Sequence, residues 1–236
     1  MERGRGLRLT TNRVLLFVAV VVLVLLAFSS ALDEVETGSD AGGAVRDWVA
    51  LLIVPLALAG VGYVYTSYET RRTRAIEQAR AEEARLGTFL DEMNDLIFDH
   101  GLRSAQPGAD VRRVARTRTL TVLLNMSSER KRRPLKAVYE LDLVSRASPI
   151  VSLEQADLDR AVLSEAVLPG IDLHGVYLRS ADLTGADLQG ADLSGARLDE
   201  ADLRRANLSG AEVSRQQLDR ARSLAGTVMP DGPTHP

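Results

Sequence analysis

Residues 181–210 read ADLTG ADLQG ADLSG ARLDE ADLRR ANLSG, a pattern that repeats every five positions. An α-helix turns by about 100° per residue, so leucines five apart would spread around its axis and form no apolar face. In a strand, side chains alternate with period two, so the same leucines would point to opposite faces. A period of five therefore predicts a chain that turns a corner in every pentad and directs its first and third residues inward.

The repeat runs from 151 to 215 as thirteen pentads, with Ala first in ten of them and Leu third in all but the last. Four corners would close a coil of about twenty residues, and coils would stack at a strand spacing of about 4.8 Å. No coil can bury its interior alone, so stability comes from stacking. We expect the solenoid core to consist of Leu153, Leu158, Leu163, Leu168, Leu173, Leu178, Leu183, Leu188, Leu193, Leu198, Leu203, Leu208 and Val213.

The stretch ADLTGADLQGADLSGARLDEADLRRANLSG resembles the pentapeptide-repeat family, whose motif is A(D/N)LXX. The flanking stretches FLDEMNDLIFDHGLRS and LDRARSLAGTVMPDG resemble bacterial membrane proteins that join a transmembrane hairpin, a helical region and a short solenoid. The resemblance implies an all-α membrane hairpin and helical region followed by an all-β, right-handed quadrilateral β-helix. Four residues depart from the Asp or Asn usual at the second position: Val162, Val167, Tyr177 and Arg197.

Two uncharged runs, 14–32 and 48–66, are long enough to cross a bilayer as helices. Basic residues in 1–13 and after the second run flank an acidic connection, 33–47, which predicts both termini in the cytoplasm by the positive-inside rule. The sequence thus predicts a two-span plasma-membrane protein with the lipid bilayer as a partner. A cleaved signal peptide is the alternative interpretation of the first run.

Residues 67–150 are expected to form a cytoplasmic helical region. A short heptad seam within it would pack on the chain's own helices or form a homo-oligomer; its members are Ile76, Ala79, Glu83, Leu86, Leu90, Met93 and Ile97. Ten basic residues against two acids lie between 103 and 136. They would form solvated helix faces or bind anionic lipid. Nucleic acid is less favoured because aromatic residues for stacking are scarce.

The end of the chain, 216–236, is expected to cap the last coil and then form a tail. Ser214 and Gln217 have the spacing of a helix capping box. Such a box would start a short helix over the open end of the solenoid, where unpaired backbone groups need a cover.

The composition argues against an enzyme. The chain has no cysteine and three histidines, His100, His174 and His235, which lie far apart in the sequence. It contains no phosphate-binding, dinucleotide-binding or zinc-protease motif. We therefore expect no catalytic residue, metal, cofactor or small-molecule substrate.

The expected function is that of a membrane-anchored cytoplasmic scaffold that binds another protein. The alternatives are a DNA-mimicking regulator of a topoisomerase and an auxiliary subunit of a membrane complex or transporter. Columns of aspartates twenty residues apart, such as Asp172 with Asp192, would form either a functional acidic face or a ladder that holds the turns. Tyr177 and Arg197 would stack on one another, and we expect them to contact the partner because interfaces favour these residue types.

Overall fold

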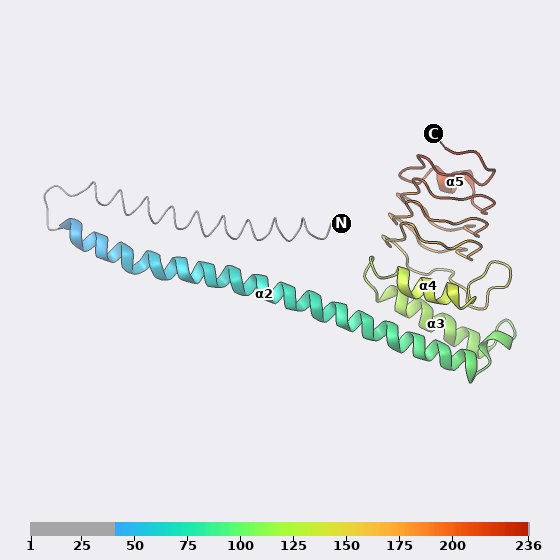
Figure 1. The fold of residues 1–236 in the computed structure, drawn as a ribbon, viewed down its shortest axis with the longest axis horizontal. Helices are drawn as coiled ribbons and strands as arrows, with labels where there is room; N and C mark the ends of the chain where they lie inside the picture. The colour runs from blue at the N-terminus through green and yellow to red at the C-terminus, as the bar shows by residue number, and fades with distance from the viewer. Residues whose placement is uncertain (1–40, 236) are drawn as a thin grey trace. The chain divides into compact units, whose positions relative to one another are not determined.

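The computed structural model describes residues 41–235, so the expected segments 1–13 and 14–32 lie outside the described residues. The chain divides into two compact units, Met1–Gln78 and Ala79–Pro236, and each is considered by itself. Helix α2 (Ala41–Phe98) begins in the first unit and ends in the second. The other helices, all in the second unit (Figure 1), are η1 (Leu102–Ser104), α3 (Asp110–Leu124), α4 (Arg132–Glu140) and α5 (Arg215–Leu218).

The expectation of two membrane spans needs correction. A spanning helix requires about 20 consecutive, mostly apolar residues. Among the described residues, no helix combines that length with that apolar character. The run 48–66 lies within α2, so the prediction that it forms a transmembrane helix is wrong. This finding contradicts the two-span localisation with both termini in the cytoplasm.

In the second unit, α2 from Ala79 onward shares one apolar interior with α3 and α4. The buried side chains of these helices are Leu86, Phe89, Met93, Leu96, Ile97, Ala115, Val122, Leu123, Leu135 and Val138. The C-terminal part of the expected heptad seam is thus covered by the chain's own helices, whereas Ile76 is 45% exposed. Self-association through 76–97 stays a prediction.

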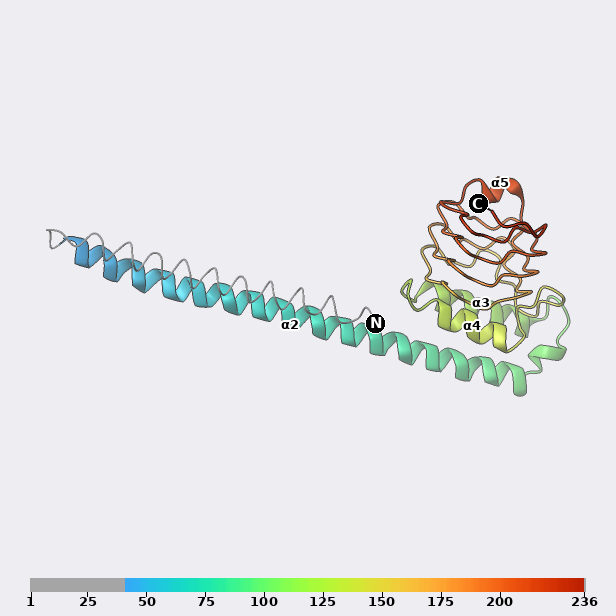
Figure 2. The ribbon, with the colours of Figure 1, turned by 45° about the horizontal axis from the view of Figure 1, so that its top comes forward.

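From 151 onward the chain winds into stacked coils above the helical layer (Figures 1 and 2). Parallel bridges join residues twenty apart, for example Asp157 to Tyr177 and Tyr177 to Arg197. Within a pentad these parallel bridges are made by the second residue alone, so the ladders consist of isolated bridges, and no longer strand occurs in residues 41–235. The β-helix expected from the sequence is therefore a solenoid whose sides are each one bridge wide.

Backbone hydrogen bonds between coils follow one rule. The N–H of a third residue donates to the carbonyl of a second residue in the next coil, as from Leu178 to Arg197 (2.9 Å). The N–H of a second residue donates back to the carbonyl of a first residue, as from Tyr177 to Ala156 (3.0 Å). The N–H of a fifth residue donates to the carbonyl of a fourth residue in the next coil, as from Arg160 to Arg179 (2.8 Å). The first coil has no coil before it, so the carbonyls of its second and fourth residues need other donors.

The fifth residue of each pentad turns the corner in a left-handed conformation. From Gln155 to Gly210 every fifth residue has a φ between 54° and 70°. Glycine adopts this conformation without a Cβ clash, which explains why it occupies six of these twelve positions. At Gly175 an added Cβ would also approach Cγ of Glu154 to 2.9 Å. The repeat pattern alone did not predict this role of the fifth position.

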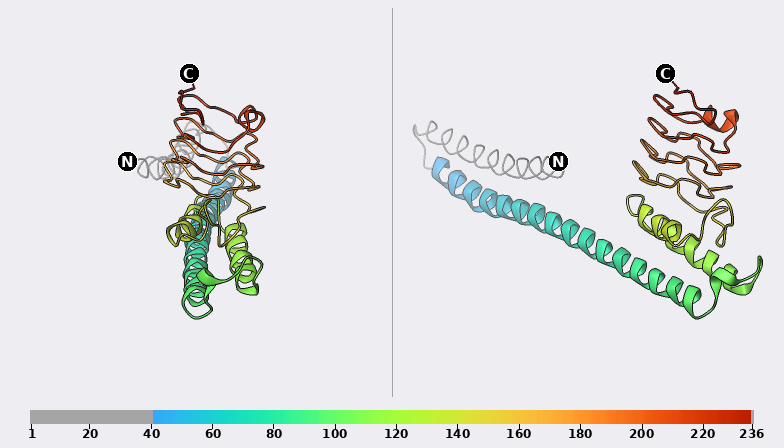
Figure 3. Two further views of the ribbon diagram at one scale, coloured as in Figure 1. Left: turned by 90° about the vertical axis from the view of Figure 1, so that its right-hand side faces the viewer. Right: turned by 45° about the vertical axis from the view of Figure 1, so that its right-hand side comes forward.

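The helical layer covers the first coil (Figure 3) and bonds to the carbonyls that a preceding coil would otherwise use. Lys131 Nζ donates to the carbonyl of Asp157 (2.7 Å), Arg132 to that of Ser164 (3.0 Å), Arg116 to that of Glu154 (2.7 Å) and the Tyr139 hydroxyl to that of Pro169 (2.9 Å). Asp157 is a second residue and the other three acceptors are fourth residues. The helical layer is therefore the N-terminal cap of the solenoid.

This cap accounts for much of the basic stretch. Each of its ten basic side chains, from Arg103 to Lys136, contacts an acidic side chain or a backbone carbonyl of the same chain. Arg118, for example, pairs with Glu92 at 3.4 Å. Binding of anionic lipid by this stretch stays a prediction.

At the other end, α5 confirms the predicted capping box. Ser214 Oγ accepts from the N–H of Gln217 (3.3 Å), and Gln217 Oε1 accepts from the N–H of Ser214 (2.9 Å). The repeats then continue: Ser223 bridges Asp202, and Val228 bridges Asn207, at intervals of 21 because the α5 turn adds one residue. The segment expected to be a tail thus completes a fourth coil.

Candidate interaction surface

The bridging second residues define four sides of the solenoid. Side 1 contains 172, 192 and 212; side 2 contains 157, 177 and 197; side 3 contains 162, 182, 202 and 223; side 4 contains 167, 187, 207 and 228. Six of the eight arginines between 151 and 231 belong to pentads of sides 2 and 3. The four sides therefore differ in charge although they share one backbone.

The predicted core residues lie inside these sides. All twelve third-position leucines from Leu153 to Leu208 are at most 2% exposed, and Val213 is partly buried against them. First positions such as Ala186 are buried beside them. The interior is filled by side chains, so a partner has access only to the outer residues of the sides and to the ends.

The aspartate columns hold the turns. A carboxylate oxygen at a second position accepts a hydrogen bond from the backbone N–H two residues later: Asp182 accepts from Thr184 (3.0 Å), and Asp192 accepts from Ser194 (2.8 Å). Asp187 does the same for Gln189 (3.2 Å). In residues 41–235, no group of three His, Cys, Asp or Glu side chains is placed to hold a metal ion. These bonds give the ladder a structural role.

Asp202 on side 3 forms the most buried ionic group of the solenoid. Its side chain is 4% exposed, and Oδ2 accepts from Arg204 (2.7 Å) and Arg222 (2.6 Å). The hydrogen bond from Arg204 is the largest cause that holds the pKa of Asp202 well below its usual value; burial opposes it and Arg222 reinforces it. Because Arg222 belongs to the fourth coil, this cluster ties that coil to the third.

Side 2 carries the predicted contact residues. Arg197 lies over the ring of Tyr177, with its guanidinium carbon 4.9 Å from the ring centroid, and Arg179 approaches the same ring at 5.7 Å. Tyr177 is half-buried, whereas both arginines are exposed. The structure therefore brings the two predicted residues together and adds Arg179, which was not predicted as a contact residue. The sequence signal that could have identified Arg179 is its position two residues after Tyr177, in the same turn.

The backbone accommodates tyrosine at this place. An Asp at 177 would bond to the N–H of Arg179, as the other second-position aspartates do for their turns. Instead, Asp159 of the preceding coil accepts that N–H at 2.8 Å. The turn thus keeps its hydrogen bond, and the tyrosine ring is available to the two arginines.

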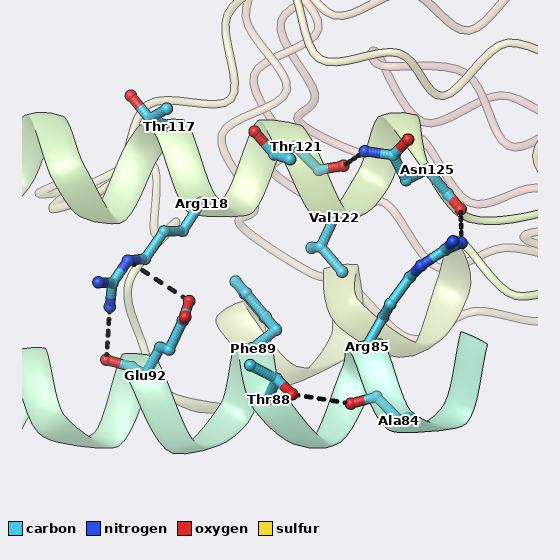
Figure 4. Close-up of a pocket in the computed structure, with 10 residues that line it drawn as sticks. All are labelled: Ala84, Arg85, Thr88, Phe89, Glu92, Thr117, Arg118, Thr121, Val122 and Asn125. Atoms are coloured by element: carbon cyan, nitrogen blue, oxygen red, sulfur yellow. Dashed lines mark hydrogen bonds and ion pairs between the residues drawn. The ribbon is translucent and has the colours of Figure 1, made fainter. Parts of the chain in front are cut away.

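A separate groove of about 600 Å³ lies between α2 and α3 (Figure 4). Phe89 and Val122 point into it from the two helices but are almost fully buried. Arg118 is bound to Glu92, and Arg85 is bound to the carbonyl of Asn125 (3.3 Å). The charged side chains that line the groove are thus paired with one another or with the backbone.

The histidines do not form a cluster. His100 lies 3.4 Å from Asp95 in the loop after α2, and His174 is exposed on side 1. The N–H of His235 donates to the carbonyl of Thr227 near the end of the chain. These positions provide no pair of histidines that could act together.

Comparison with known proteins identifies the repeats. Residues 156–195 and 186–222 match the family description "Pentapeptide repeats", in eight copies. Together with the coil geometry, this match shows that the C-terminal part of the chain is a pentapeptide-repeat domain. No curated protein matches the chain.

Three solved structures of pentapeptide-repeat proteins are similar to part of the chain. One, from the cyanobacterium Cyanothece 51142, is 36% identical with a TM-score of 0.21, over 33% of this chain and 52% of its own. A second, from the Arabidopsis thaliana thylakoid lumen, is 27% identical with a TM-score of 0.16, over 34% and 55%. A third, from Nostoc PCC 7120, is 31% identical with a TM-score of 0.16, over 40% and 72%. The similarity thus spans about half the length of the first two.

Proposed function

We propose that this pentapeptide-repeat protein is a non-catalytic module that binds another protein through side 2 of its solenoid. Pentapeptide-repeat proteins are in general structural or interaction modules without enzymatic activity. Solenoids bind through extended surfaces built from adjacent repeats. The proposal concerns the solenoid and its helical cap.

The observation that carries the proposal is the group formed by the half-buried Tyr177 and the exposed Arg179 and Arg197. Second-position aspartates elsewhere are engaged with their own turns, whereas Tyr177 and Arg197 make no such bond. Tyrosine and arginine are the residue types that dominate interface energetics, and here they adjoin in successive coils. Side 2 thus offers a partner a rigid aromatic anchor with two cations.

The test is a capture experiment with the full-length tagged chain and its double variant Tyr177→Asp with Arg197→Asp. Asp is the usual residue at this position, so we expect the fold to be retained, and circular dichroism checks it. Partner recovery, quantified by mass spectrometry, should fall at least tenfold. A matched control, Gln189→Asp with Ser209→Asp on side 4, should recover the partner normally. Equal recovery by the folded side 2 variant and the unmodified chain would exclude side 2.

A further inference from the structure

The two arginines around Tyr177 differ from those solenoid arginines that are paired with an aspartate. Arg204 and Arg222 are bound to Asp202, and Arg220 lies 3.7 Å from Asp199. The guanidinium groups of Arg179 and Arg197 contact the Tyr177 ring and make no ion pair or hydrogen bond with any residue in 41–235. Their N–H donors therefore face solvent.

The ring also restrains these two cations. A guanidinium group within about 6 Å of an aromatic centroid is attracted to the ring face. It keeps its planar set of donors for a carboxylate, which it can bind through two parallel hydrogen bonds. A side chain that is already restrained loses less conformational entropy on binding. Arg179 and Arg197 should thus lose less conformational entropy on binding an anion than a freely moving surface arginine would.

The surroundings limit what the anion can be. Asp159 and Asp199 lie next to the arginines in the same column of turns, and Glu200 follows Asp199. Acids this close would repel a ligand with a continuous negative charge, such as nucleic acid or an anionic membrane surface. They tolerate separate carboxylates with neutral residues between them. An extended peptide presents such carboxylates on one face when acidic residues alternate with neutral ones.

We propose that Arg179, Tyr177 and Arg197 form a clamp for two carboxylates of an extended acidic segment in a partner protein. This inference rests on the proposed function, because it names the chemistry that side 2 recognises. In the clamp, each guanidinium group donates to one carboxylate, and the Tyr177 ring keeps both groups in place. No covalent step is involved.

The test measures binding of short fluorescent peptides to the full-length chain by anisotropy at low and physiological salt. The acidic probe alternates Glu with Ser, and the neutral probe has Gln in place of Glu. We expect the acidic probe to bind at least tenfold more tightly than the neutral one. The double variant Arg179→Gln with Arg197→Gln should abolish this preference, and Tyr177→Leu should reduce it several-fold because the ring restrains both arginines.

The matched control is Arg205→Gln with Arg215→Gln, which removes the same charge from two exposed arginines outside side 2. It should keep the preference for the acidic probe. An equal loss in this control would show general charge attraction and overturn the clamp. Equal binding of the two peptides, or tighter clamp-dependent binding of a phosphorylated peptide or a single-stranded oligonucleotide, would also overturn it.

The outcome is separable from that of the proposed function. If the Tyr177→Asp, Arg197→Asp variant loses its partner while Arg179→Gln with Arg197→Gln binds the acidic peptide normally, side 2 is the interface but the clamp is wrong. If the variant keeps its partner while the peptide preference depends on Arg179 and Arg197, the clamp exists but side 2 does not hold that partner.

Discussion

Replacement of Lys131 by methionine tests whether the helical layer caps the solenoid. Lys131 is 5% exposed, and its Nζ donates to the carbonyl of Asp157 (2.7 Å) and to its carboxylate (3.0 Å). Methionine fills nearly the same space, so the substitution removes the charge and the donor rather than the packing. The carbonyl of Asp157 then lacks the partner that a preceding coil would have supplied.

The expected cost follows from these contacts. A buried carbonyl left without a donor costs about 1–3 kcal/mol. The lost ion pair adds less than about 1 kcal/mol, because the Asp157 side chain is 37% exposed. A total of about 1–4 kcal/mol should lower the unfolding midpoint by roughly 2–16 °C in a unit of this size. Lys136→Met is the control, because Lys136 pairs only with Glu140 on the exposed face of α4 (3.3 Å) and should change stability by less than about 0.5 kcal/mol.

The assay is thermal and urea unfolding of the full-length chain, followed by circular dichroism. Tryptophan fluorescence would not report on this unit, because Trp48 belongs to the other one. A lower midpoint for Lys131→Met with an unchanged midpoint for Lys136→Met supports the cap. Coincident curves for the two variants would refute the reasoning.

Three further variants test other parts of the unit. Leu188→Asp should unfold the solenoid, because it places an unpaired charge at a position with 0% exposure. Gln189→Asp, at an outward position, should have the melting temperature of the unmodified chain. Equal melting temperatures for the two variants would show that the inward and outward positions of the repeat are wrongly assigned. The pKa of Asp202 is depressed in the folded state, so the stability that its carboxylate contributes should be present above about pH 4 and lost as the pH falls. Asp202→Asn should therefore lower the free energy of unfolding at pH 7 and make it depend less on pH in the acid range, as measured by urea titrations. Parallel pH profiles of the variant and the unmodified chain would contradict this. Gln217→Ala removes two hydrogen bonds to carbonyls of the third coil (2.7 and 2.8 Å) and should lower the melting temperature, whereas the exposed Gln216→Ala should not; equal temperatures would exclude a capping role.

The sequence predicted the solenoid because its signal is local and repeated. A leucine such as Leu188 recurs every five residues, and neither a helix nor a strand can bury that pattern on one face. The fourth coil was missed because α5 shifts the register by one residue, although RSLAG at 222–226 keeps Leu third and Gly fifth. A register search that allowed one insertion would have found it.

The N-terminal cap could not be predicted in the same way. Lys131 and Asp157 are 26 residues apart, and Arg116 and Glu154 are 38 apart, so nothing in the local pattern connects them. The basic residues were predicted to form a charged surface because the sequence shows their charge but not the backbone carbonyls to which they donate hydrogen bonds. Tyr177 and Arg197 were found because they break a regular pattern at twenty-residue spacing, whereas Arg179 occupies a turn position where many residue types occur.

The two ends of the solenoid explain why its sides are the place to look for a partner. An open coil exposes backbone donors and acceptors that would pair with any strand they met. Here the first coil is covered by the helical layer, and the last is covered in part by α5 and by residues 233–235, which bond back to Gly226 and Thr227. Binding at either end would have to displace these contacts. Binding on a side displaces only water, and among the four sides side 2 combines an accessible ring with two unpaired cations.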